Sequence, residues 1–171
     1  MRSKAILVLG SLLAIGGCRG SESSVLQSER VPARAITKLA IVPGSGVLGD
    51  AVGVELFNRG LTIIDPQEAV AIIGRVGLSE FEVTSTNGFK ALQEKGIDAV
   101  LSVKSVDALD GTPESASVRV TDTATGQIIA GITWQNGNKG LGLIYLLTRK
   151  NLHQAANDIA GKLAKRLQSD Q

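Results

Sequence analysis

Apolar and polar positions follow two different periods along the chain, and the first half combines short buried runs with helical spacing. Apolar runs at residues 38–42 and 61–64 predict two buried strands. Helical spacing after the first run predicts a helix over 47–59. The apolar face expected for that helix consists of Leu48, Val52, Leu56 and Phe57. Strand and helix therefore alternate, as in a parallel βαβ unit.

Two more helices are expected before residue 97. Asp65 precedes Pro66, so its carboxylate can cap a helix that begins at the proline. Thr84 or Thr86 is the expected cap of the next helix, which Gly96 ends.

The second half changes to a period of two. Residues 97–106, 116–122 and 127–134 alternate apolar with polar side chains, which predicts three strands. Gly126 lies in the turn between the last two strands, where a positive φ favours a hairpin. A long final helix is expected to carry the stripe Ile144, Thr148, Leu152, Ala155, Ile159 and Leu163. The predicted fold class is α/β (α+β): a mixed β-sheet with a parallel βαβ start and an antiparallel C-terminal hairpin, with helices packed on its faces.

The N-terminus has the pattern of an export signal. Arg2 and Lys4 precede an apolar run that is too short to span a bilayer. The run ends in Ile15-Gly16-Gly17-Cys18, which resembles the lipobox of bacterial lipoproteins. We therefore expect residues 1–17 to be a lipoprotein signal peptide, cleaved between Gly17 and Cys18, with diacylglycerol and fatty acid (palmitate) on Cys18.

Removal of that signal changes the charge balance. The chain has 18 Lys+Arg and 16 Asp+Glu, and loss of Arg2 and Lys4 leaves 16 of each. Nothing then indicates a nucleic-acid partner. Residues 18–36 are expected to be a lipidated flexible tether, and residues 37–171 a single periplasmic domain. Arg19 follows the cysteine where an inner-membrane retention signal would have aspartate, which favours the periplasmic face of the outer membrane.

The segment "IVPGSGVLGD" contains the spacing of a dinucleotide-binding loop, with Gly44, Gly46 and Gly49 between a strand and a helix. The exported location and the antiparallel second half oppose that interpretation. In a second interpretation the glycines allow a sharp turn and close packing. A third remains open: backbone amides of a loop formed by Gly44, Ser45, Gly46 and Gly49 bind an anion.

Other candidate chemistry is sparse. Cys18 is the only cysteine and His153 the only histidine, so neither a disulfide within one chain nor a zinc site is expected. His153 is not expected to act as a catalytic base, because the sequence shows no nucleophile motif such as G-x-S-x-G. Glu80 and Glu82 are interpreted as solvated charges. We expect no metal, no cofactor and no enzymatic activity.

The run "LGLIYLL" at residues 141–147 is a candidate interface because it combines apolar residues and Tyr145 with neighbouring basic residues. Its expected contact residues are Leu141, Leu143, Ile144 and Tyr145. The alternative is that this run is the buried start of the final helix.

Four phrases resemble one group of bacterial envelope proteins. They are "KLAIVP" at 38–43, "LTIID" at 61–65, "GIDAVLSV" at 96–103 and "VRVTDTATG" at 118–126. The group includes the curli secretion channel lipoprotein (CsgG-like) family, lipoprotein activators of penicillin-binding proteins, and the N-terminal domain of the Tol-system β-propeller protein. The resemblance implies a periplasmic, non-catalytic domain that acts through protein contacts or ring assembly.

The chain departs from the channel-forming members because it has no spare pair of long alternating segments that would cross the outer membrane. We therefore expect an accessory lipoprotein in secretion, appendage assembly or cell-wall synthesis, with envelope proteins as partners and possible homo-oligomers. The alternative function is a small-molecule or anion-binding lipoprotein that uses the loop from Gly44 to Gly49.

Overall fold

The computed structural model describes residues 21–26, 35–137 and 149–168; for 21–26 it describes the backbone only. Its sheet has six strands in the order β1-β6-β5-β4-β2-β3. The strands are β1 (Ser21–Leu26), β2 (Lys38–Ile41), β3 (Thr62–Ile64), β4 (Ala99–Asp107), β5 (Pro113–Asp122) and β6 (Ile128–Asn136). β2 pairs in parallel with β3 and β4, and all other pairs are antiparallel. The predicted mixed sheet is confirmed.

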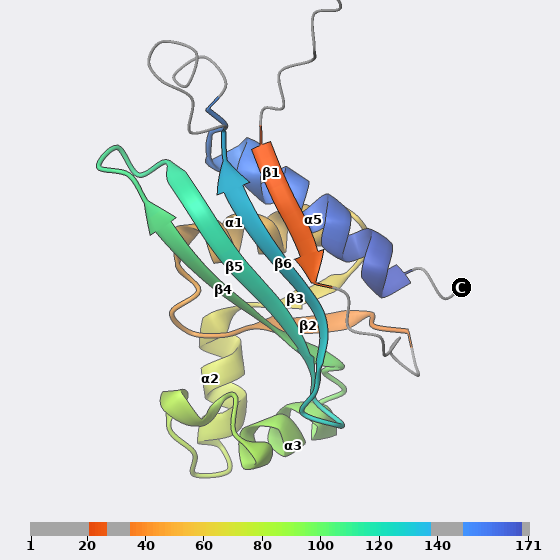
Figure 1. Cartoon of the computed structure of the whole chain (residues 1–171). Helices are drawn as coiled ribbons and strands as arrows, with labels where there is room; N and C mark the ends of the chain where they lie inside the picture. Colours follow the sequence, from red (N-terminus) through yellow and green to blue (C-terminus); the bar gives the residue numbers. More distant parts are fainter. Residues whose placement is uncertain (1–20, 27–34, 138–148, 169–171) are drawn as a thin grey trace, which may run out of the picture.

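Two helices cover one face of the sheet, α1 (Gly46–Phe57) and α5 (Leu152–Gln168). Figure 1 shows α5 lying behind β1 and β6, with α1 beside it. The main core lies between these helices and the strands, and includes Leu39, Leu101, Trp134 and Ile159. Three residues of the expected α1 face, Leu48, Val52 and Leu56, are buried, as predicted.

The opposite face is covered only over the parallel strands. α2 (Pro66–Gly74), the 3-10 turn η1 (Glu80–Glu82) and α3 (Thr86–Glu94) form this second layer. Alternation along β2 and β4 sends Ala40 and Val100 into this smaller core, whereas Leu39 and Leu101 point into the main one. β2 and the first residues of β4 are thus buried on both sides, whereas β3, at the edge of the sheet, is only partly buried.

Two sequence expectations need correction. Ser85, and not Thr84 or Thr86, caps α3, because its hydroxyl accepts a hydrogen bond from the Gly88 amide at 3.0 Å. Phe57 is 65% exposed, because it directly follows the buried Leu56 and so lies about 100° further round the helix. Glu80 and Glu82 are exposed, as expected for solvated charges, and the Glu82 carboxylate also forms a capping box with Ser79, which lowers the pKa of its carboxyl group.

The expected tether is also corrected in part. Ser21–Leu26 form strand β1, which pairs antiparallel with β6 from Ser21 opposite Asn136 to Leu26 opposite Gly131. The physical reason is that β6 would otherwise be an edge strand with unpaired backbone groups.

Candidate interaction surfaces and the neck of the 137–149 segment

The glycine loop makes a tight turn from β2 into α1. Gly44 and Gly46 have φ values of 79° and 65°, which favour glycine. Between them, Ser45 is buried, and its hydroxyl donates to the Val42 carbonyl at 2.7 Å while accepting from the Val103 amide at 3.3 Å. The serine side chain therefore fastens the turn to β4 and does not point out toward a ligand.

Two further glycines allow α1 to pack closely. A Cβ atom at Gly49 would lie 2.5 Å from the Ser45 Cβ, and one at Gly53 would lie 2.5 Å from the Ile41 Cδ1. Both separations are far below van der Waals contact. This geometry confirms that the glycines serve the turn and close packing, and anion binding by the loop stays a prediction.

A groove runs along the junction of α1 and α2. It consists of two adjoining cavities of about 490 and 450 Å³, which share Asp50, Pro66 and Gln67 in their walls. The first is lined by Gly44 to Gly46 and by Glu80, and the second by Val54, Phe57 and Ile63. Carboxylates at the glycine end repel an anion, so the groove suits apolar side chains better than a phosphate.

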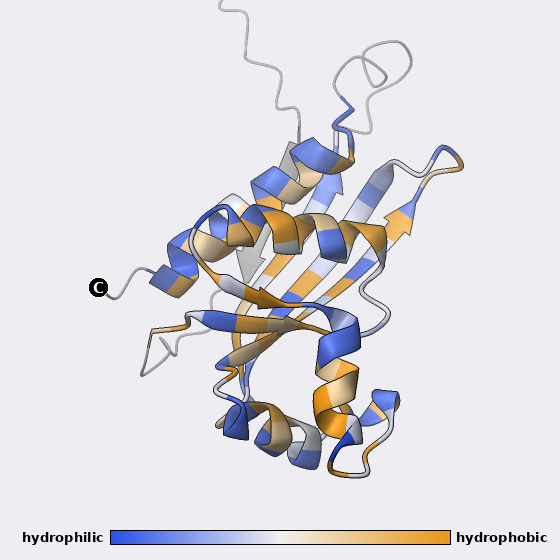
Figure 2. Cartoon of the chain, turned by 180° about the vertical axis from the view of Figure 1, so that it is seen from behind, coloured by the Kyte–Doolittle hydropathy of each residue, from blue (hydrophilic) through white to orange (hydrophobic). Residues whose placement is uncertain are grey.

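The outer side of α1 carries exposed apolar side chains next to this groove. Val47, Val54 and Phe57 are 71%, 60% and 65% exposed and lie on one face of the helix by their spacing. We call these three residues the α1 stripe. Figure 2, which views the molecule from the side of α1 and α5, shows α1 as apolar over much of its length. The exposed Asp50 lies on the same face between Val47 and Val54, so the uninterrupted apolar part of the stripe is the pair Val54 and Phe57. Exposed apolar side chains grouped in this way are typical of a contact surface.

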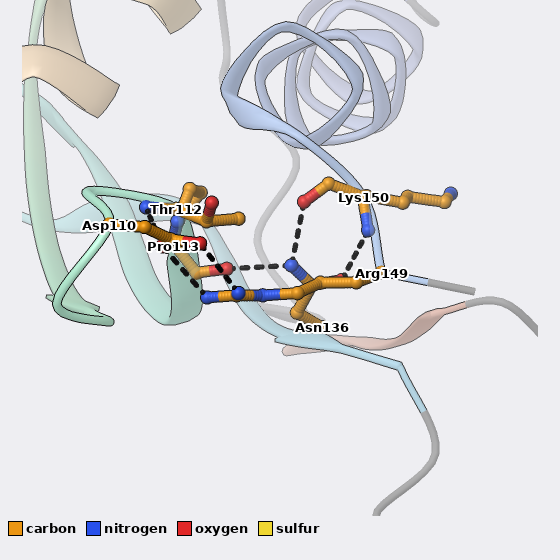
Figure 3. A network of polar contacts seen from close by, with 6 residues as sticks. All are labelled: Asp110, Thr112, Pro113, Asn136, Arg149 and Lys150. Atoms are coloured by element: carbon orange, nitrogen blue, oxygen red, sulfur yellow. Dashed lines mark hydrogen bonds and ion pairs between the residues drawn. The ribbon is translucent and has the colours of Figure 1, made fainter. Parts of the chain in front are cut away.

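A buried asparagine, Asn136, forms hydrogen bonds at the base of the segment expected to be an interface. The Asn136 side chain donates to the Pro113 carbonyl at 2.8 Å and to the Lys150 carbonyl at 2.7 Å, and accepts from the Lys150 amide at 2.8 Å. Figure 3 shows it between the start of β5 and the residues that lead into α5. The amide thus joins the two ends of the 137–149 segment. The expected contact residues Leu141, Leu143, Ile144 and Tyr145 lie outside the described residues.

An ion pair lies beside this amide (Figure 3). The Arg149 guanidinium donates to both carboxylate oxygens of Asp110, at 2.8 and 3.2 Å. The Thr112 amide also donates to Asp110, at 2.9 Å, and this hydrogen bond is the main reason that the pKa of Asp110 is lowered. Lys150 in turn forms an ion pair with Asp158 of α5. The contacts of Asn136, Asp110 and Arg149 cannot be predicted from the sequence, because they join positions far apart in the chain.

The single histidine lies on the surface. The His153 side chain is 80% exposed, and its Nδ1 lies 3.4 Å from a Glu55 carboxylate oxygen. Glu55 also pairs with Arg59 at 2.6 Å, and Arg59 donates to Asn157 of α5 at 2.6 Å. These contacts hold α1 and α5 together, so Glu55, the partner of His153, has a structural role.

Within the described ranges, no cluster of three or more His, Cys, Asp or Glu side chains is arranged to hold a metal ion. The helices of those ranges are all too short or too polar to cross a bilayer. Gly17 and Cys18, the predicted cleavage and lipidation site, lie outside the described residues.

Comparison with known proteins finds similarity in structure only. No protein-family model matches the chain. No curated protein sequence matches it either. Among solved structures, the PelC dodecamer from Paraburkholderia phytofirmans is similar, with a TM-score of 0.50 and 16% identity over 88% of this chain and 99% of that one.

Two other similar structures have lower TM-scores. The LpoB C-terminal domain from Salmonella enterica has a TM-score of 0.46 and 18% identity over 61% of this chain and 86% of that one. Lipoprotein GNA1162 from Neisseria meningitidis also has a TM-score of 0.46 and 18% identity, over 75% and 96%. The resemblances to the curli channel and to the Tol protein stay predictions. The likeness to PelC concerns the fold alone: this chain has the mixed α/β fold of that structure.

Proposed function

We propose that this protein is a lipid-anchored, non-catalytic accessory of the bacterial cell envelope that works by binding proteins, including further copies of itself. The observation that carries the proposal is the α1 stripe beside the apolar end of the groove. Val54 and Phe57 are largely exposed and also line the groove, so a single partner side chain inserted there would contact both helix and cavity.

The proposed localisation follows from the N-terminal sequence. The lipobox ending at Cys18 supports a lipid anchor, and Arg19 supports the periplasmic face of the outer membrane. Secretion, appendage assembly and cell-wall synthesis are the pathways that the family resemblance implies. Turnover of a substrate is not part of the proposal, because the groove brings together carboxylates and apolar side chains without a nucleophile beside a base.

Self-association is supported by the similar fold of the PelC dodecamer. A ring of identical subunits uses head-to-tail contacts, in which two different patches of each subunit meet. The α1 stripe and groove would be one of these patches. A second exposed apolar surface on each subunit would supply the other.

The test is crosslinking of the tagged, lipidated full chain in intact cells, followed by mass spectrometry. We expect crosslinks between copies or to defined envelope proteins, and at least a tenfold loss of them in the double variant Val54→Ser, Phe57→Ser. Val76→Ser is the matched control, since Val76 is 56% exposed and lies away from the groove. If the double variant and the control crosslink like the wild type, the stripe is not the contact surface.

The alternative function is binding of a small molecule at the glycine end of the groove, favoured by the cavity of about 490 Å³ there. Isothermal titration with phosphate, NAD and peptidoglycan fragments tests it. Gly46→Val is expected to abolish any heat, because valine does not readily adopt a φ of 65°. Circular dichroism of that variant must show an intact fold, and no heat with the wild type ends this alternative.

A further inference from the structure

The first strand begins close to the predicted lipid. Ser21 lies three positions after Cys18 in the sequence, so the two Cα atoms are at most about 11 Å apart. A bilayer's polar headgroup layer is itself about 5–8 Å thick on each side. A lipid on Cys18 therefore holds the N-terminal end of β1 at the membrane surface. This step rests on the lipidation proposed above.

β1 is paired into the sheet, so the same constraint orients the whole domain. Ser21 lies opposite Asn136, at the end of β6. β6 pairs with β5, and the β4–β5 hairpin turns at the same end of the sheet, where Asp107 lies opposite Pro113. Figure 1 shows the start of β1, the end of β6 and the β4–β5 turn at one end. We call this the anchor-side end, consisting of Ser21, Asn136 and residues 106–112.

The anchor-side end has an apolar tip. Leu109, in the β4–β5 turn, is fully exposed, and Val106 is 61% exposed. The neighbouring Asp110 carboxylate is bound by Arg149, which offsets its charge toward the lipid surface. Asp107 carries a further negative charge at this end. Lys150 carries a positive charge, which forms an ion pair with Asp158. At the opposite end of the sheet, the β5–β6 turn exposes the polar residues Thr125 and Gln127, and the apolar Ile128 that follows is only 46% exposed, whereas Leu109 is fully exposed.

We propose that the anchor-side end is a membrane-contact surface, with Leu109 inserted into the interface of the bilayer that holds the Cys18 lipid. The strands then stand with this end on the membrane, and the β5–β6 turn points away from it. Insertion of one exposed leucine favours this orientation by about tenfold to a hundredfold over one that leaves it in water. The α1 stripe remains on the side of the domain and accessible to partners.

The experiment uses the lipidated full chain carrying Leu109→Cys. Lipidation converts the thiol of Cys18 to a thioether, so the new cysteine is the only one left to label with an environment-sensitive fluorophore. The protein is reconstituted into vesicles of phosphatidylethanolamine and phosphatidylglycerol, with and without brominated acyl chains. Thr125→Cys, at the opposite turn, is the matched control.

We expect a blue-shifted emission and quenching by the brominated lipid at position 109, and neither at position 125. Absence of lipid quenching at 109, or equal quenching at both positions, overturns the proposal. A label at 109 that is shielded from aqueous iodide and yet not quenched by lipid would assign this end to a protein contact, which also overturns it.

Flotation of the vesicles separates failure of this inference from failure of the proposed anchor. Protein that floats with the vesicles without quenching at 109 retains its anchor and refutes only the orientation. Protein that does not float lacks the lipid, and then both the proposed anchor and the orientation fail.

Discussion

Replacement of Asn136 by alanine is expected to destabilise the domain strongly, although the residue lies at a strand end. Its side chain is buried, 3% exposed, and makes three hydrogen bonds of 2.7 to 2.8 Å with Pro113 and Lys150. Each such bond contributes about 1 kcal/mol net. Alanine removes all three and leaves the partner groups dependent on water, so we expect a loss of about 2–4 kcal/mol, out of a total that is typically 5–15 kcal/mol.

Trp134 supplies the assay, since it is the only tryptophan in the chain and is completely buried. Urea unfolding is followed by its fluorescence and, independently, by circular dichroism. Thr133→Ala is the control, because Thr133 lies exposed on the same strand and its replacement should cost less than about 1 kcal/mol. Asn136→Asp keeps the shape but faces two carbonyl oxygens with an acceptor, and should be at least as costly as Asn136→Ala. A urea midpoint for Asn136→Ala that is no lower than that of Thr133→Ala would refute the stabilising role of the Asn136 hydrogen bonds.

Three other predictions follow from local geometry. Gly88→Ala should cost several kcal/mol in urea unfolding, because its Cβ would lie 2.1 Å from the Glu82 carbonyl oxygen, whereas Gly74→Ala, with open space, should cost nothing or stabilise by about 0.5–1 kcal/mol. Asp65→Ala should cost about 1 kcal/mol, since its carboxylate accepts from the Glu68 amide at 2.8 Å; an unchanged midpoint would contradict the cap. The lowered pKa of Asp110 means that its contribution to stability is present above its ordinary value of 3.8 and lost as pH falls through the lowered one. Asp110→Asn should therefore lower the free energy of unfolding at neutral pH, where this contribution is present, and flatten the acid limb of the pH-stability curve, so that variant and wild type converge as pH falls through the lowered pKa.

The elements that sequence predicts well are those fixed by neighbours in the chain. Pro43 and Pro66 end or begin elements through their own rings, and Asp65 caps α2 three residues before its partner. Gly126 has the positive φ expected in the β5–β6 turn. Such local chemistry does not depend on the rest of the fold, so it can be read directly from the order of residues.

The features that sequence analysis missed depend on contacts between distant positions. "SESSVL" has little apolar alternation, and it becomes β1 because β6 offers an unpaired edge more than a hundred residues later. Asn136 looks like any polar strand end until Pro113 and Lys150 surround it. The expected cap of α3 is wrong by one residue because residues 84–86 all carry hydroxyl groups, and only the backbone conformation selects Ser85.

Burial of β2 and β4 on both sides has a consequence for local opening of the native state. Leu39 and Leu101 face the core under α1 and α5, while Ala40 and Val100 face the core under α2 and α3. Exposure of these strands requires both layers to separate, whereas α2 and α3 can detach by breaking the smaller core alone. Amide hydrogens of β2 and β4 should thus exchange with deuterium only through global unfolding, and those of α3 should exchange earlier as one cooperative unit.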